Sequence, residues 1–275
     1  VKMQKGKKMS TVTTTTLSAE MNTFYDMRLI DEASPMLVHE QFGQKRPIPQ
    51  GGGKTVNFRR FSPLAKATTA LTEGVTPSGS SLSVSSISAI VAQYGDYVVQ
   101  SDVLELTAVD NSILETTKLL GRQAGLTMDT IVRNALLLGT NKSYAPKYVA
   151  DTNGNLVETE VTKTADLDTS AKLTVDVVQR VVAKLRAQNA PTIGGDYVCI
   201  IHPYVAYDLM RDPEWIDAHK YATPENLYTG EIGKMAGVRF VQSTEAKIDK
   251  GGSDNPSGLA VFHCLFIGDG AYGVT

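Results

Sequence analysis

The glycine-rich segment Gly51-Gly52-Gly53-Lys54-Thr55 ends in the manner of a phosphate-binding loop. Such a loop has another glycine five positions before Gly53, but that position holds Ile48. The loop must also open into a helix, whose N-terminus supplies the amide groups and the dipole that bind phosphate. Alternating residue types from Lys54 to Phe61 predict a strand instead. We therefore expect no nucleotide-binding site in this segment.

A second glycine motif, Gly268-Asp269-Gly270-Ala271-Tyr272-Gly273, matches the dinucleotide-binding fingerprint and follows an apolar run. The fingerprint also requires a crossover helix and an acidic residue about 20 positions further on. The sequence continues only to Thr275, so neither is available here. We predict a turn between two strands.

Metal-type ligands occur in two places, Cys199 with His202 and His263 with Cys264. Adjacent residues on a strand point to opposite faces, so His263 and Cys264 do not suit one zinc site. None of the four histidines lies near a recognisable nucleophile elbow. The sequence therefore predicts no catalytic, cofactor-binding or metal-binding residue, and hence a protein that is not an enzyme. A nucleotide-dependent enzyme, based on the two glycine motifs, is the alternative of another class.

The composition allows one large domain or two smaller ones, since 42% of the 275 residues are hydrophobic. A formal net charge of −2 argues against a dedicated nucleic-acid binder, which normally has a strong basic excess. Two cysteines imply no disulfide framework and fit a reducing compartment. The longest apolar run, Leu259 to Ile267, is too short to cross a membrane. We expect no membrane association and no export.

The N-terminal region divides into a tail and an arm. Residues 1–16 are basic and then threonine-rich, which is typical of a mobile tail. From Ser18, apolar residues recur at helical spacing until Ser34-Pro35 ends the pattern: Met21, Phe24, Tyr25 and Leu29. The sequence offers no adjacent helix with which this amphipathic arm could pair. We therefore expect the arm to lie on another surface, for example that of a neighbouring subunit.

An overlong hairpin comes next. A strand at 54–61 is followed by a loop rich in Gly, Pro and Ser at 72–81, and by a second extended run at 82–99. That run could reach roughly 55 Å at about 3.3 Å per residue. A change of apolar phase at Ser85-Ser86 predicts a β-bulge. A ribbon this long with weak apolar faces cannot be stabilised by its own burial, so it needs partners.

Helices and strands alternate in the rest of the chain, which predicts an α+β fold. A long helix at 112–138 opens with the capping box Ser112-x-x-Glu115, and a second helix starts at Thr174 and ends at Asn189. Between them, Asn153-Gly154 predicts a hairpin turn. The apolar face of the long helix is predicted at Ile113, Leu120, Ala124, Ile131, Ala135 and Leu138. Strands are predicted at 197–201, 238–242 and 259–267, and the last is apolar on both faces, so we expect it at the centre of a sheet.

Four strings closely resemble the N-four type family of tailed-phage major capsid proteins. They are FGQKRPIPQGGGKTVNFRRFSPL (42–64), LTEGVTPSG (71–79), QYGDYVVQSDVLELTAVDN (93–111) and IIHPYVAYDLMRDPEWIDAHKYATPENLYTGEIGKMAGVRFVQS (200–243). The similarity extends over nearly everything from about residue 17 to residue 275. Several long strings in the same order are far more specific than any single short motif.

The resemblance implies the Hong-Kong-97-type capsid fold. Its parts would be an N-terminal tail and arm (1–47), an extended β-hairpin loop (48–101), a peripheral domain (102–196) with the spine helix 112–138, and an axial α/β domain (197–275). The final strands could return to the peripheral domain.

The function expected from these observations is self-assembly, through hexamers and pentamers, into the icosahedral shell of a bacteriophage virion. The hairpin would contact a neighbouring subunit through its open edges and through Arg59, Arg60 and Glu73. A covalent shell linked through Lys54 or Lys66 is a less favoured variant.

Portal protein, scaffolding or decoration proteins and packaged double-stranded DNA, contacted without sequence preference, are the expected partners, and no cofactor is expected. Assembly is expected in the cytoplasm of the bacterial host. The alternative with the same fold is an encapsulin-like nanocompartment shell that encloses protein cargo.

Overall fold

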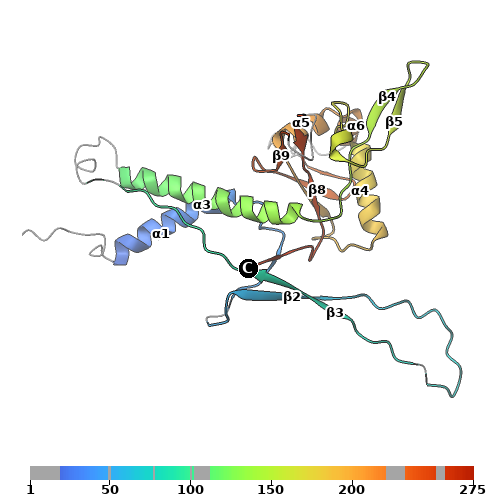
Figure 1. Ribbon diagram of the computed structural model, residues 1–275, viewed down its shortest axis with the longest axis horizontal. Coiled ribbons are helices and arrows are strands. Elements are labelled where there is room, and N and C mark those ends of the chain that lie inside the picture. The colour runs from blue at the N-terminus through green and yellow to red at the C-terminus, as the bar shows by residue number, and fades with distance from the viewer. Residues whose placement is uncertain are drawn as a thin grey trace, which may run out of the picture. The chain divides into compact units, whose positions relative to one another are not determined.

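The computed structural model describes residues 19–48, 51–76, 78–99, 101, 112–220, 233–251 and 258–275. The predicted tail, residues 1–16, lies outside this part of the chain. The helices are α1 (Ala19–Ala33), α3 (Ser112–Leu137), α4 (Val175–Ala187), α5 (Pro203–Met210) and α6 (Pro213–Lys220), with 3-10 turns η2 (Ser34–Met36) and η3 (Thr164–Asp166). The strands are β1 (Gln44–Lys45), β2 (Thr55–Phe61), β3 (Val84–Ile90), β4 (Lys147–Ala150), β5 (Leu156–Thr159), β6 (Tyr197–Ile201), β7 (Lys234–Met235), β8 (Val238–Gln242), β9 (Ile248–Asp249), β10 (Val261–Phe262), β11 (Leu265–Ile267) and β12 (Gly273–Val274) (Figure 1).

These residues form two compact units. The first lies within Val1–Phe42 and Gly95–Asp269, and the second within Gly43–Tyr94 and Gly270–Thr275. The four-part division into arm, extended loop, peripheral domain and axial domain stays a prediction.

The core of the first unit surrounds a four-stranded sheet with the strand order β11-β6-β8-β7. β6 and β8 run parallel, and all five residues of β6 are buried. Helices α4, α5 and α6 contribute Val178, Leu209 and Trp215 to this core. Thr174 caps α4 by accepting a hydrogen bond from the amide of Val177. The helix–strand alternation predicted from sequence therefore builds one continuous core.

The predicted strand 259–267 is wrong in its extent and its place. The chain forms β10, leaves the ladder at His263-Cys264 and resumes as β11. β10 pairs with β9, whereas β11 pairs with β6 and lies at the edge of the four-stranded sheet. The centre belongs to β6 and β8, so an apolar run on both faces did not identify the central strand.

The arm helix α1 packs along α3 of its own chain, so it does have a helix partner (Figure 1). The buried positions of α3 are Gly121, Gly125 and Asp129, which recur every four residues on one face. The predicted apolar face of α3 is a different one, and Ala124, Ala135 and Leu138 on it are exposed. Side-chain hydrophobicity therefore pointed away from the face that α1 covers.

The second unit is built on the antiparallel pair β2–β3. Its register is continuous from Thr55 opposite Ile90 to Phe61 opposite Val84, so the predicted bulge at Ser85-Ser86 is wrong. The phase change has a simpler cause, because Ile87 lies on the face of Phe58 while Val84 lies on the opposite face with Phe61. Apolar residues occur on both faces of a regular ladder. The second extended run is a strand only over Val84–Ile90 and not over the whole of 82–99.

Candidate inter-subunit surface

The hairpin β2–β3 and the loop that joins its strands have almost no core. Val56 is the one buried residue among the described residues of the second unit. Large apolar side chains of this unit are exposed, among them Leu71 and Ile90 at 76% and 78%. Figure 1 shows the loop from 62 to 83 running on beyond the paired strands. Isolated two-stranded ribbons are marginally stable in water, and exposed apolar surface of this kind is typical of an interaction site.

The three residues predicted to contact a neighbour do not form one cluster. Arg59 and Arg60 are consecutive on β2, so their side chains leave opposite faces, where they face Ser86 and Ser85 across the ladder. Glu73 lies in the turn in which the amide of Val75 donates to the carbonyl of Thr72. All three side chains are exposed, and none has an ion-pair partner among the described residues. Their role in subunit contact stays a prediction.

The base of the hairpin is held by segments from both ends of the chain. β12 pairs in parallel with β1, and the amides of Gln44 and Arg46 donate to Tyr272 and Val274. A Cβ at Gly273 would overlap a ring carbon of Phe58, so a larger residue there would force this ring to move. The second glycine motif therefore ends in a turn at Gly270 and a short strand, as predicted.

Helix α1 meets α3 through backbone contacts. A Cβ at Gly121 would lie 2.8 Å from the carbonyl oxygen of Leu29, and a Cβ at Gly125 would lie 2.6 Å from that of Ala33. The backbones of α1 and α3 therefore lie closer together than they could if either glycine were a larger residue. We call this contact of Gly121 and Gly125 with α1 the glycine seam. The sequence signal for it is two glycines four residues apart.

We expect Gly125→Val to loosen α1 from α3. The added methyl groups would meet a backbone oxygen that cannot move aside as a side chain can, and overpacking of this kind costs about 1–3 kcal/mol. Hydrogen exchange of the α1 amides should accelerate, whereas Ala124→Val on an exposed position of the same helix should leave it unchanged. Equal exchange in the two variants would contradict the seam.

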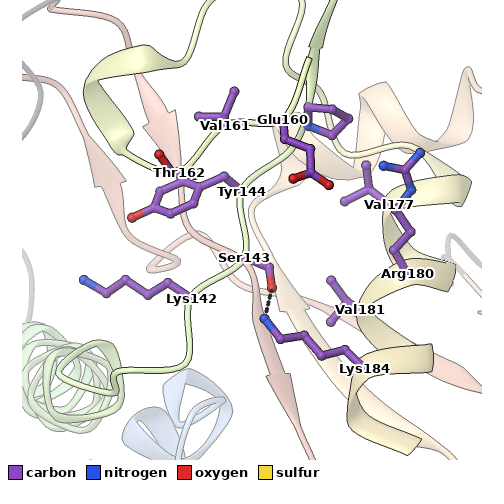
Figure 2. A pocket seen from close by; sticks show the side chains of 11 residues that line it. Lys142, Ser143, Tyr144, Glu160, Val161, Thr162, Val177, Arg180, Val181 and Lys184 are labelled. Atoms are coloured by element: carbon purple, nitrogen blue, oxygen red, sulfur yellow. Dashed lines mark hydrogen bonds between the residues drawn. The ribbon is translucent and has the colours of Figure 1, made fainter. Parts of the chain in front are cut away.

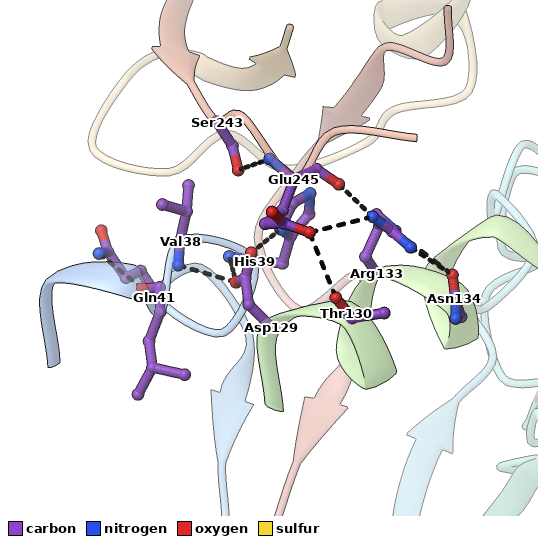
Figure 3. A network of polar contacts seen from close by, with 10 residues as sticks. Val38, His39, Gln41, Asp129, Thr130, Arg133, Asn134, Ser243 and Glu245 are labelled. Atoms are coloured by element: carbon purple, nitrogen blue, oxygen red, sulfur yellow. Dashed lines mark hydrogen bonds and ion pairs between the residues drawn. The ribbon is translucent and has the colours of Figure 1, made fainter. Parts of the chain in front are cut away.

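A polar network continues the seam at Asp129, shown in Figure 3. Asp129 and His39 are fully buried, and the ring Nδ1 of His39 lies 2.7 Å from Oδ2 of Asp129. The other carboxylate oxygen accepts from the amides of Val38 and His39 at 2.8 and 2.7 Å. One turn later on α3, Arg133 donates to the carbonyl oxygen of Glu245. One stretch of α3 thus holds the end of the arm and the loop after β8.

A hollow of about 400 Å³ lies beside α4, and Figure 2 shows its lining. Val161, Val177 and Val181 form an apolar part, and Lys184 donates to the hydroxyl of Ser143. The guanidinium of Arg180 is occupied by Glu158 and Asp176. The hollow presents no catalytic arrangement of side chains.

The sites weighed from sequence do not assemble into a reactive centre. The glycine segment 51–53 leads into strand β2 rather than a helix. Burial raises the pKa of the Cys199 thiol and raises that of Cys264 to about 12, so both stay protonated at neutral pH. Among the described residues, no group of three His, Cys, Asp or Glu side chains could hold a metal ion, and no helix is long and apolar enough to cross a membrane.

Comparison with known proteins adds a family and a fold. Residues 112–261 match the family model described as phage capsid protein. No curated protein sequence matches the chain.

Three solved phage structures share the fold, and two of them are described as capsids. The capsid of the cyanophage P-SCSP1u is 16% identical with a TM-score of 0.56, and the match covers 80% of this chain and 67% of that one. The capsid of Ralstonia phage GP4 is 16% identical with a TM-score of 0.54, at 84% and 73% coverage. The structure of Mycobacterium phage Che8 is 16% identical with a TM-score of 0.51, at 76% and 69% coverage.

These likenesses confirm the predicted α+β fold of the Hong-Kong-97 type. The matched region 112–261 is more than half of the 275 residues, and it runs from the start of α3 into β10. The chain therefore belongs to the phage capsid protein family.

Proposed function

We propose that this capsid protein assembles through hexamers and pentamers into an icosahedral shell around double-stranded phage DNA. The observation that carries the proposal is the small core of the second unit, the one built on β2 and β3. Among its described residues, Val56 alone is buried. A polypeptide stretch with so little core becomes ordered when copies of the chain cover it. Many such contacts, each weak, make a stable container when symmetry closes them.

The remaining roles follow from this proposal. In the proposed shell, residues 17–47 would be the N-terminal arm and α3 the spine helix. Residues 48–101 would be the extended loop, and the domain from Tyr197 onward would be the axial domain. Arg59, Arg60 and Glu73 would contact the neighbouring subunit. With a net charge of −2, the chain would meet packaged DNA without sequence preference, through a minority of basic side chains.

The work of this protein would be association and not catalysis. Portal, scaffolding or decoration proteins are its proposed further partners. Its proposed places are the host cytoplasm during assembly and the virion afterwards.

Negative-stain microscopy of the purified chain tests the proposal. We expect closed shells or ring-shaped capsomers at micromolar concentration, because the uncovered hairpin surface drives association. A solution that remains monodisperse monomer at that concentration would contradict self-assembly. In particles recovered from infected cells, extracted double-stranded DNA would support a genome container, and enclosed protein without DNA would indicate a nanocompartment.

A further inference from the structure

The strands β4 and β5 form a small hairpin, residues 147–159, that we call the finger. It projects from the first unit beside α4 (Figure 1). Its apolar side chains are exposed on both faces, since Leu156 is 71% exposed on one face and the cross-strand pair Val149–Val157 is exposed on the other. A free two-stranded hairpin gains nothing from such residues in water, so their exposure indicates a contact surface.

The finger is held rigid at its tip. Asp151 Oδ1 accepts from the amides of Asn153 and Asn155, each at 2.8 Å, and Gly154 takes the left-handed conformation with φ of 84°. These amides, that of Asn155 first, lower the pKa of Asp151, so the tip carries a full negative charge at neutral pH. This carboxylate has no cation partner among the described residues.

The base of the finger is equally fixed. Glu158 accepts from Arg180 of α4 at 3.0 Å, and Arg180 also lies 2.7 Å from Asp176. On the other strand, the amide of Tyr148 donates to the hydroxyl of Ser170 at 3.0 Å. A surface ordered before binding loses little entropy when it binds, which favours a specific contact.

A second exposed surface of the same unit lies on α5, and we call it the aromatic patch. Tyr204, Tyr207 and Arg211 follow one another at helical spacing, and the two tyrosines are 68% and 57% exposed. The guanidinium of Arg211 lies 5.5 Å from the centre of the Tyr207 ring. Tyr204 meets Phe262 of β10 edge to face, with 6.3 Å between ring centres. Exposed Tyr and Arg side chains are the types that dominate binding energy at interfaces.

The finger and the patch complement each other but do not cover each other within one chain, since both stay exposed. The finger offers aliphatic side chains and an unpaired carboxylate, and the patch offers aromatic rings. The patch also holds Arg211, which has no ion pair among the described residues. Aromatic residues and Arg are enriched in interface cores, and an opposite-charge contact adds specificity.

We infer that the finger of one copy docks on the aromatic patch of the next copy, with Asp151 facing Arg211. Because the two surfaces differ, the contact is head to tail, and repetition of a head-to-tail contact closes a ring when the rotation allows it. The inference rests on the proposed assembly through hexamers and pentamers, and it names one contact within those rings.

Directed cross-linking tests the contact. Leu156→Cys and Tyr204→Cys are made in separate chains, co-expressed, and treated with a short thiol-to-thiol cross-linker. The native Cys199 and Cys264 react little because their thiol pKa values are raised. We expect a cross-linked dimer from the co-expressed pair and none above background from either variant alone. No excess of dimer in the pair would overturn the contact.

A charge reversal gives the second test. Arg211→Glu should lower the yield of capsomers at least tenfold, because it places two negative charges together. Lys250→Glu, the same charge change on another exposed side chain of the unit, should leave the yield unchanged. Equal yields from the two variants would overturn the contact.

The two proposals fail separately. Shells from the unmodified chain without the cross-link would refute the finger contact and leave the proposed function standing. A cross-link from a chain that forms neither shells nor capsomers would support the contact and refute closed assembly. Absence of both would refute both.

Discussion

Deletion of Leu71 to Ser81 is expected to abolish shell assembly while the sheet domain stays folded. The deleted residues belong to the loop between β2 and β3, in which every described residue is exposed. Leu71 and Val75 lose no contact with a core when they are removed, because they are 76% and 63% exposed. Loop shortening changes stability little, since the entropy of closing a loop varies slowly with its length. What the deletion removes is surface available to a neighbour.

Microscopy and thermal unfolding measure the two halves of this result. Closed particles should disappear. The melting temperature of the first unit, which holds the four-stranded sheet, should shift by no more than about 2 °C, which corresponds to a change in stability well under 1 kcal/mol. A control chain in which the same eleven positions become Gly and Ser keeps the length of the loop but removes its side chains, and it should fail to assemble in the same way. Normal shells from either variant would mean that this loop is not an assembly contact.

Local signals account for the elements that sequence alone located. Helix α4 (Val175–Ala187) has Thr174 as its N-cap, and Asn189 follows its C-cap in the left-handed conformation with a φ of 52°. Capping and left-handed residues act over only a few positions, so the sequence locates both ends. The Asn153-Gly154 turn likewise lies between β4 and β5, where it was predicted. Alternation located β2, but it overextended β3 and placed a bulge in it. These features depend on neighbours in sequence, so a single sequence is enough to find them.

Order within the sheet and the contacts of the spine helix depend on distant parts of the chain. The run 259–267 is apolar on both faces, yet β11 is an edge strand, because position in a sheet depends on which other strands are present. Asp129 and His39 are 90 residues apart, and no periodicity links them. The seam at Gly121 and Gly125 was open to prediction from the spacing of small residues, but the larger apolar residues of α3 indicated another face. On α3, close backbone packing against α1 replaces the burial of large side chains, so hydrophobicity alone does not identify the contact face.

Asp129→Ala is expected to release the end of the arm from α3 and to destabilise the first unit by about 1–3 kcal/mol for each buried donor that loses its acceptor. The carboxylate accepts from the buried ring and amide of His39 and from the part-buried amide of Val38, and the alanine variant leaves these donors without their acceptor. A loss of this size is a large fraction of the 5–15 kcal/mol that typically separates folded from unfolded domains. Denaturant unfolding followed by the fluorescence of Trp215, which is buried in the core of the same unit, gives the change in stability.

Two further variants separate the network from a general effect of losing an acid. Asp129→Asn keeps the volume and one acceptor oxygen for the amides of Val38 and His39, so it should lose less than the alanine variant. Asp166→Ala removes an exposed carboxylate and should stay within about 0.5 kcal/mol of the parent. Hydrogen exchange at the amides of Val38 and His39 should accelerate in the order Asp166→Ala, Asp129→Asn, Asp129→Ala. If Asp129→Ala instead unfolds at the same denaturant concentration as Asp166→Ala, the buried carboxylate does not hold the arm, and the glycine seam alone must position α1 on the spine.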